Sequence, residues 1–361
     1  MTVTRDTLTA TTTDGWSLRL THYHPQTIPE NPIPVILCHG LAANKNSCDF
    51  GEPGTPQWDR YSLAAHLTST QPAFHAWVPE LRGNGTPTDD PHQHPDKYRW
   101  TVDDYIDFDV PAIITTVQDW HHDHTGRRPQ VFWVGKSMGG MIAYAYGETP
   151  AGRQTLKGVV TLGSPVVFGK TGVLLEFLTR IMPRNIAIPL RLPDLVLKSP
   201  ELKRYLAKIS VNPDNIDPKI WEQYLRTGHQ TVLSTKVISQ FSLFFRHTTF
   251  CRYPSHPWVY DTIGRLPAIK KIVAPYSYTD HLSQFTAPLL AIAGGQDHLG
   301  PPTDVQYVTS HVGSTDATYL ELSQKNGFSA DYGHLDLNLG LHARDEVYPR
   351  IAQWLRERSL L

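Results

Sequence analysis

The chain has few cysteines, no long apolar run and almost no net charge. Its 361 residues include only Cys38, Cys48 and Cys251, too few and odd in number for a disulfide framework. A formal net charge of −1 without a long basic run argues against nucleic acid or an anionic membrane surface as a partner. No stretch approaches the roughly 18 apolar residues of a membrane-spanning helix, and residues 1–14 lack the apolar core of a signal peptide. We expect a cytoplasmic protein without an integral membrane segment; its oligomeric state is left open.

The composition, 40% hydrophobic and 19% charged, is typical of a globular protein with a sizeable core. Short runs rich in β-branched and aromatic residues predict strands, and amphipathic runs between them predict helices. Strands are expected at 18–23, with a hairpin partner at 4–12, and at 35–38, 74–78, 131–135, 158–162, 289–293 and 317–322. Helices are expected at 58–67, from Thr101 with a kink near Pro111, after Ser137, from about Pro302, and around Ile351. This alternation indicates an α/β fold with a mostly parallel sheet flanked by helices.

The alternation stops after the sixth strand. Residues 166–285 show helical periodicity but no convincing strand. We therefore expect a core of residues 1–165 and 286–361 with a helical cap inserted at 166–285, a length within the usual range of a domain. Apolar residues at helical spacing in this insertion, such as Val173, Phe177 and Ile181, suit either the lining of an acyl pocket or the core that holds the cap to the sheet.

A strand that runs directly into a helix through Gly-Lys-Ser-Met-Gly at 135–139 is the most informative stretch. Such a junction forces a sharp turn that presents the serine hydroxyl, and the two glycines avoid collisions with the neighbouring strand and helix. Because the turn presents its hydroxyl, Ser137 is the candidate nucleophile. The alternative is a glycine-rich turn whose serine takes no part in catalysis.

A serine nucleophile needs a base to accept its proton and an acid to orient that base. Asp297 follows the strand at 289–293, and His334 follows the last strand, so both stand at carboxyl ends of strands, where ligand sites lie in such sheets. The rivals for the base are His298 and His281. The poorer candidates for the acid are Asp304, Asp331 and Asp336.

Acyl transfer also needs two N–H donors for the oxyanion that forms on the attacked carbonyl. The residue after the nucleophile, Met138, is one candidate. The other is Leu41 in the loop that follows the strand at 35–38, unless Gly40 merely ends that strand in a turn. His39 is expected to orient this loop, and Gly40 and Lys136 border the binding site.

Histidines also gather at His92 and His94, and again at His121, His122 and His124. Both groups lie in polar, loop-like sequence, so we interpret them as solvated surface. A serine–histidine–aspartate mechanism needs no metal, and we expect neither a metal nor another cofactor.

These motifs together resemble the α/β-hydrolase superfamily, and more narrowly its lipase and polyhydroxyalkanoate-synthase-related branch. The resemblance rests on residues 38–44, 79–85, 134–140, 295–297 and 332–336, and it covers about 18–165 and 289–361. It implies that Ser137, Asp297 and His334 form a catalytic triad. Two departures matter: Lys136 replaces the usual histidine or small polar residue, and Ser137 replaces the cysteine of the synthases, which favours hydrolysis over polymer synthesis.

We therefore expect a serine hydrolase that cleaves carboxylic esters with a medium or long acyl chain, acting on a small-molecule or lipid substrate through an acyl-enzyme. Thioesterase, carbon–carbon bond hydrolase, haloperoxidase and acyltransferase chemistry use the same triad and remain alternatives. A ligand receptor built on a hydrolase scaffold is the alternative from another class.

Overall fold

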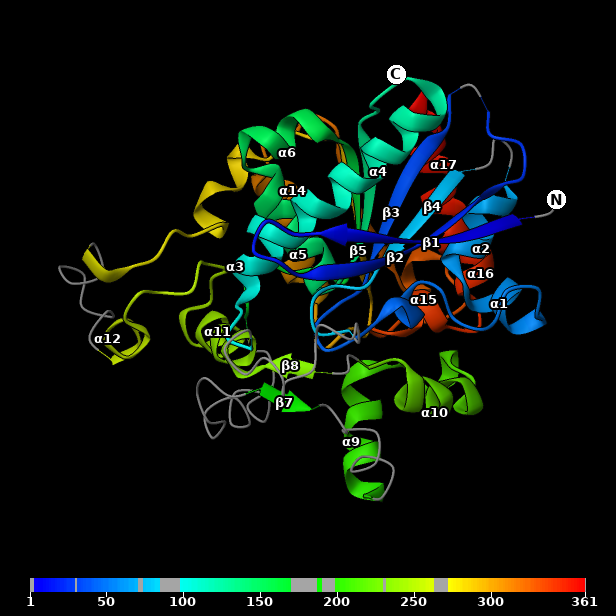
Figure 1. Cartoon of the computed structure of the whole chain (residues 1–361). Coiled ribbons are helices and arrows are strands. Elements are labelled where there is room, and N and C mark those ends of the chain that lie inside the picture. Colours follow the sequence, from blue (N-terminus) through cyan, green and yellow to red (C-terminus); the bar gives the residue numbers. More distant parts are fainter. Residues whose placement is uncertain are drawn as a thin grey trace.

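An eight-stranded sheet forms the centre of the protein (Figure 1). The computed structural model describes residues 3–29, 31–70, 74–84, 98–169, 187–189, 199–229, 232–262 and 272–360, without the side chains of 187–189 and Leu202. The strand order is β1-β2-β4-β3-β5-β6-β9-β10. The strands are β1 (Val3–Thr11), β2 (Ser17–Pro25), β3 (Ile33–Cys38), β4 (Phe74–Pro79), β5 (Val131–Lys136), β6 (Leu156–Leu162), β9 (Leu289–Gly294) and β10 (Ala317–Leu322).

The sheet is parallel except at one edge. β1 pairs antiparallel with β2, and β2 antiparallel with β4, whereas all other neighbours run parallel. The carboxyl ends of β3, β5, β6, β9 and β10 therefore meet at one edge of the sheet. This confirms the predicted hairpin and the mostly parallel sheet.

Helices cover both faces of this sheet (Figure 1). The alternation of side chains along β5 shows the two layers, since Trp133 packs into one apolar core and Val134 into the other. The first core includes α4 (Val110–Thr125), α5 (Met138–Gly147) and α14 (Pro302–His311); the second includes α2 (Leu63–Ser69) and α17 (Tyr348–Ser359). Because both faces are covered, β5 is buried throughout.

Two predicted helices differ in detail from the structure. The helix expected at 58–67 is split into α1 (Pro56–Tyr61) and α2, because Ser62 is extended and its hydroxyl accepts the N–H of Ala65 as an N-cap. The helix expected from Thr101 consists of α3 (Val102–Asp104), a π-helical turn at Tyr105–Asp109 (η4) and α4. The irregularity expected near Pro111 thus lies just before it.

Between β6 and β9 the structure contains two short strands as well as helices, so the expectation of no strand in this segment was wrong. β7 (Ala187–Pro189) and β8 (Val232–Ser234) pair antiparallel. The other elements are α9 (Pro200–Ser210), η5 (Pro213–Asn215), α10 (Pro218–Thr227), α11 (Thr235–His247), α12 (Pro257–Thr262) and η6 (Thr279–Gln284). A strand of three residues is too short to show the alternation that predicts strands. Val173, Phe177 and Ile181 lie outside the described residues.

The segment between β6 and β9 contacts the loops at the carboxyl ends of the sheet strands. Ala43, after β3, forms a β-bridge with His229, and Gly340, after β10, forms one with Ile216. Val232 donates its N–H to the carbonyl of Gly83 in the loop after β4. In Figure 1 α9, α10 and α11 accordingly lie together beyond one end of the sheet.

The remaining short elements connect the larger ones. They are η1 (Lys45–Ser47), α6 (Pro150–Thr155), η7 (Gln324–Asn326), α15 (Asp336–Leu339) and α16 (Ala343–Glu346). Within the described ranges, no helix is both long and apolar enough to span a membrane.

Candidate active site

Ser137 occupies the sharp turn between β5 and α5 in a backbone conformation that non-glycine residues rarely adopt. Its φ is 52° and its ψ is −121°, which implies local strain held by the surroundings. The N–H of Ser137 donates to the carbonyl of Leu162 on β6 and ties the turn to the sheet.

The glycines on either side of Ser137 are required by close packing. A Cβ on Gly135 would lie 2.4 Å from backbone atoms of Gly139 and Gly140, and a Cβ on Gly139 would lie 2.5 Å from the carbonyl oxygen of Cys38. Gly135 thus allows the helix to approach, and Gly139 allows the end of β3 to approach. The geometry agrees with the steric reason inferred from the motif.

His334 and Asp297 form a buried pair. His334 Nδ1 lies 2.7 Å from Asp297 Oδ2, so the ring donates Nδ1–H to the carboxylate and leaves Nε2 unprotonated in the neutral form. The other carboxylate oxygen, Oδ1, accepts the N–H groups of Leu299 at 2.8 Å and Gly300 at 2.7 Å. These bonds fix the carboxylate that orients the imidazole.

Gly163, directly after β6, holds a place that sequence reasoning missed. Its φ is +59°, and a Cβ there would lie 2.6 Å from Asp297 Oδ2 and 2.9 Å from His334 Nδ1. A glycine at the end of a strand was visible in the sequence, but the contact with Asp297 and His334 depends on a long-range approach.

The other candidates for the base and the acid have different partners. His298 is exposed, and His281 donates its Nδ1–H to the carbonyl of Ser277. Asp304 accepts the N–H of Gly169, and Asp331 accepts that of Gln324. The structure thus pairs His334 with Asp297 rather than with Asp304 or Asp331.

Asp336 anchors the loop that carries His334. Its Oδ2 accepts the N–H of Gly333 and the side-chain amide of Asn215, both at 2.9 Å, and its Oδ1 accepts the N–H of Asn212 at 3.2 Å. Burial raises the pKa of Asp336 to about 6 in spite of these donors. This carboxylate therefore connects the His334 loop to the segment between β6 and β9.

The loop after β3 lies against the serine. A Cβ on Gly40 would be 3.0 Å from the Cβ of Ser137, so the loop that carries Leu41 passes close to Ser137. Met138 is the first residue of α5, and N–H groups in the first turn of a helix have no intrahelical acceptor. Both candidate oxyanion donors are therefore near Ser137.

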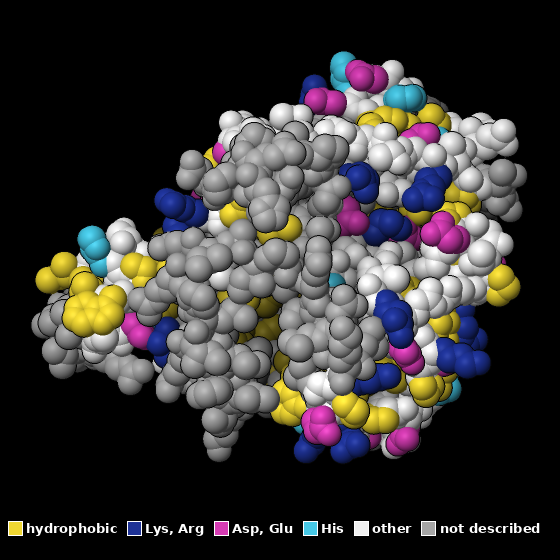
Figure 2. Space-filling model, turned by 60° about the horizontal axis from the view of Figure 1, so that its bottom comes forward, with side chains coloured by type: hydrophobic (Ala, Val, Ile, Leu, Met, Phe, Trp, Pro, Cys, Tyr) yellow, Lys and Arg dark blue, Asp and Glu magenta, His cyan; other side chains and the backbone are white. Residues whose placement is uncertain are grey.

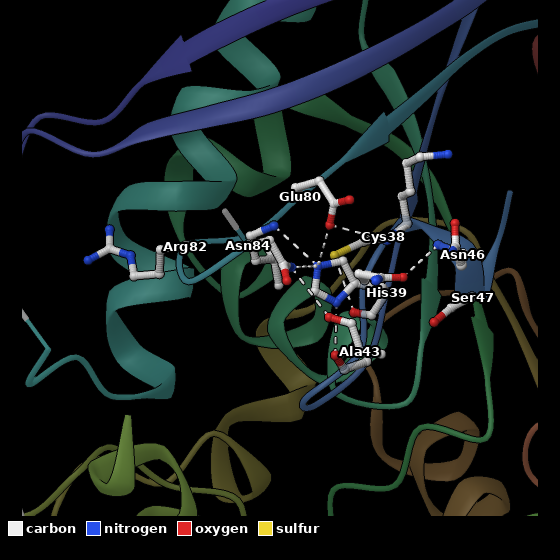
Figure 3. A network of polar contacts seen from close by, with 12 residues as sticks. Cys38, His39, Ala43, Asn46, Ser47, Glu80, Arg82 and Asn84 are labelled. Atoms are coloured by element: carbon white, nitrogen blue, oxygen red, sulfur yellow. Dashed lines mark hydrogen bonds and ion pairs between the residues drawn. The ribbon is translucent and has the colours of Figure 1, made fainter. Parts of the chain in front are cut away.

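His39 holds this loop in place as a neutral ring (Figure 3). Its Nδ1–H donates to the carbonyl of Gly40 at 2.9 Å, and its Nε2 accepts the N–H of Leu81 at 3.2 Å and the amide of Asn84 at 3.0 Å. Burial lowers the pKa of His39 to about 4. These contacts agree with the expected orienting role.

Lys136 is buried, with 2% of its surface exposed, and its Nζ donates to the carbonyl of Leu162 at 3.3 Å. Burial lowers the pKa of Lys136 to about 8, against the attraction of Asp297 and Asp336. Because the ammonium is buried, it is not positioned to contact an acidic substrate directly.

Electrostatics around the pair favour an ionised aspartate and a neutral histidine. Burial alone would raise the pKa of Asp297, but His334, Lys136 and the N–H of Gly300 outweigh it and hold that pKa below its usual value. Burial lowers the pKa of His334, and the charge of Lys136 lowers it further, whereas Asp297 raises it. A neutral His334 is the form that accepts a proton.

Two other groups of histidines were interpreted as solvated loops. His92 and His94 lie outside the described residues. His121, His122 and His124 lie in helix α4 rather than a loop, and His121 is fully buried, because the helix turns it toward the sheet.

Comparisons with known proteins agree with this fold. The model of the family described as alpha/beta hydrolase fold matches residues 33–335. A triacylglycerol lipase 2 of Arabidopsis thaliana is 21% identical over 348 residues, which cover 90% of this chain and 77% of that protein.

Solved structures share the fold at low identity. A thermophilic esterase from Thermogutta terrifontis superposes with a TM-score of 0.56 and 16% identity, covering 99% of both chains. A proline iminopeptidase from Mycobacterium smegmatis superposes with a TM-score of 0.55 and 16% identity, covering 98% of this chain and 99% of that one. Since the family model spans most of the sequence, the chain belongs to the α/β hydrolase fold family.

Proposed function

We propose that the protein is a serine hydrolase that cleaves carboxylic esters through a triad of Ser137, Asp297 and His334. The observation that carries the proposal is the strained backbone of Ser137 at the strand–helix turn, together with the buried hydrogen bond between His334 and Asp297. Backbone strain of this kind clusters at active sites.

In the proposed mechanism His334 Nε2 accepts the hydroxyl proton of Ser137 while Oγ attacks the ester carbonyl. Asp297 keeps Nδ1 protonated and stabilises the imidazolium that forms. The N–H groups of Leu41 and Met138 stabilise the oxyanion. His334 then gives its proton to the leaving alcohol, and water activated by the same ring releases the acid from the acyl-enzyme.

A medium or long acyl chain is the proposed preference. The similarity to a triacylglycerol lipase supports it, and so do large apolar side chains left exposed in α12 and in the chain that follows it. Trp258 is 63% exposed and Ile272 is 82% exposed, and Figure 2 shows hydrophobic side chains at the end of the molecule where α12 lies in Figure 1. Exposed apolar surface of this kind suits contact with a lipid interface.

A peptidase has a similar structure, so the fold alone does not identify the type of bond that is cleaved. Thioester, carbon–carbon bond, haloperoxidase and acyl-transfer chemistry would use the same serine and histidine. A ligand receptor would not react at the serine at all.

The test is turnover of p-nitrophenyl esters of increasing chain length, with and without lipid micelles, together with labelling by a fluorophosphonate. We expect the fluorophosphonate to label Ser137, and Ser137→Ala to lower kcat on the order of 10⁵-fold. Ser310→Ala, at an exposed serine of α14, is the matched control and should retain full activity.

Undiminished ester turnover in Ser137→Ala would contradict the mechanism. Labelling of Ser137 without turnover of any ester would point to one of the other triad reactions. Absence of labelling in the folded protein would favour the receptor.

A further inference from the structure

A second cluster of polar side chains lies on the antiparallel edge of the sheet. His22 of β2 stands opposite Asp6 of β1 and Trp77 of β4, and side chains directly opposite one another share a face of the sheet. His24, two residues along β2, lies on that same face. His22 is fully buried, and its ring is stacked on Trp77 at 3.6 Å between centroids.

The hydrogen bonds of His24 leave its Nε2 with a lone pair that faces the carboxylate of Asp6. Its Nδ1 lies 2.8 Å from the carbonyl of Pro25, which can only accept, so Nδ1 carries the proton of a neutral ring. Its Nε2 lies 3.0 Å from Asp6 Oδ2. Two acceptors at that distance need either a second proton or a cation between them.

This arrangement is the one that metal-binding histidines show. Such a histidine donates its other ring N–H to a backbone carbonyl, which fixes the tautomer and aims the free nitrogen at the metal. The carbonyl of Pro25 does this for His24.

His22 supplies a third ligand atom. A nitrogen of His22, one of His24 and an oxygen of Asp6 all lie within 4.8 Å of one another. His22 Nδ1 is buried and has no hydrogen-bond partner among the described residues, while Nε2 lies 3.3 Å from His75 Nδ1. A buried polar atom without a partner costs free energy that a ligand would recover.

We propose that Asp6, His22 and His24 bind a divalent transition metal, with zinc as the best match. Two imidazoles and one carboxylate form a ligand set typical of zinc, and a water completes the tetrahedron. The Asp6 side chain is 45% exposed, so solvent can reach the site from the side of Asp6. This proposal departs from the expectation, drawn from the sequence, that the chain holds no metal.

Binding requires the three ligand side chains to rearrange. Tetrahedral zinc with bonds of about 2.0–2.1 Å holds neighbouring ligand atoms about 3.4 Å apart. Asp6 Oδ2 and His24 Nε2, 3.0 Å apart, must separate slightly. The rings of His22 and His24 are stacked, with centroids 4.6 Å apart and planes at 29°, so one ring must rotate before both nitrogens face one metal. His22 is also stacked on Trp77, so His24 and the partly exposed Asp6 are the side chains that adjust. The metal would connect edge strand β1 to β2 and leave the proposed triad untouched.

The experiment uses the full-length protein, stripped with a chelator, dialysed and titrated with zinc. We expect one zinc per chain by metal analysis. At a free zinc concentration 100-fold above Kd, the Tm should rise by about 3–4 °C. Asp6→Asn and His24→Gln should lose both effects. His122→Gln, at an exposed histidine of α4, is the matched control and should retain them.

Ester turnover of the metal-free variants checks that they are folded, and Asp6→Asn, at a partly exposed and isosteric position, is the variant that preserves the fold. A wild type that binds no zinc would overturn the proposal, and so would zinc binding that both variants retain. A Tm that does not depend on zinc would instead assign the contact between His24 and Asp6 to an ordinary ion pair.

Discussion

At the scale of single residues, Lys136 is the feature that distinguishes this site. It precedes the proposed nucleophile, is buried, and lowers the pKa of His334 through the repulsion of like charges. The pKa of Lys136 itself is about 8, so the ammonium is charged throughout the range in which His334 titrates. In the proposed mechanism the lysine would therefore extend the activity of the histidine base toward acidic pH.

Replacement of Lys136 by methionine should shift the pH dependence of kcat/KM. Because His334 must be neutral to accept a proton, and the variant lacks the charge that lowers its pKa, the acidic limb should move to higher pH. Activity at acidic pH should fall more than activity at pH 8. Initial rates on a p-nitrophenyl ester across pH give the profile.

Lys219→Met, at an exposed lysine of α10, should leave the profile where it is. An acidic limb that stays in place in Lys136→Met would show that the charge of Lys136 does not reach His334.

At the scale of elements, the ends of β6 and β9 meet so closely that only a glycine fits between them. Gly163 combines a positive φ with a close approach to Asp297 and His334. The effect of the positive φ can be separated from that of the close approach by comparison with Gly327. That glycine has a φ of +85° but nothing within 4 Å of an added Cβ.

Gly163→Ala should lower kcat by about 100-fold or more, because a displacement of about 1 Å in a catalytic group costs that much. Gly327→Ala should lose stability on the order of 1 kcal/mol from backbone strain alone and retain its kcat. Steady-state kinetics and urea unfolding of both variants make the comparison. Equal kcat values in the two alanine variants would contradict the role assigned to Gly163.

At the scale of the whole molecule, Arg82 joins three separate parts of the chain. This arginine, in the loop after β4, is 1% exposed and pairs with Asp14, in the β1–β2 turn, and with Asp109, just before α4, each at 2.7 Å. Figure 3 shows it on the far side of Asn84 from His39, with its guanidinium pointing away from that ring. Burial raises the pKa of Asp109 to about 6 despite the arginine.

Arg82→Ala should lower the free energy of unfolding by about 3–5 kcal/mol, since it leaves a buried carboxylate without a partner. Arg128→Ala removes an exposed ion pair with Asp119 and should cost about 1 kcal/mol or less. Urea denaturation of both variants gives the two values. A loss as small for Arg82 as for Arg128 would contradict this assignment.

The strands and the candidate triad could be predicted because their patterns are local. Ser137 lies in a glycine-bounded turn, and Asp297 and His334 follow recognisable strands. The placement of Gly163, the bonds of His39 and the anchoring of Asp336 depend on residues distant in sequence, which no local pattern contains. The break at Ser62 was missed because the apolar spacing continues across it, and β7 and β8 are too short to be recognised.

The pairing of β6 with β9 also has a consequence for the order of events in folding. Val159 and Leu289 are neighbours in the sheet although they lie about 130 residues apart in the chain. Contacts between such distant residues form slowly, because loop closure must precede them. During synthesis the elbow at Ser137 emerges well before β9 and the residues that would activate it. In the proposed mechanism the nascent chain would therefore carry an unactivated serine until its last quarter is made.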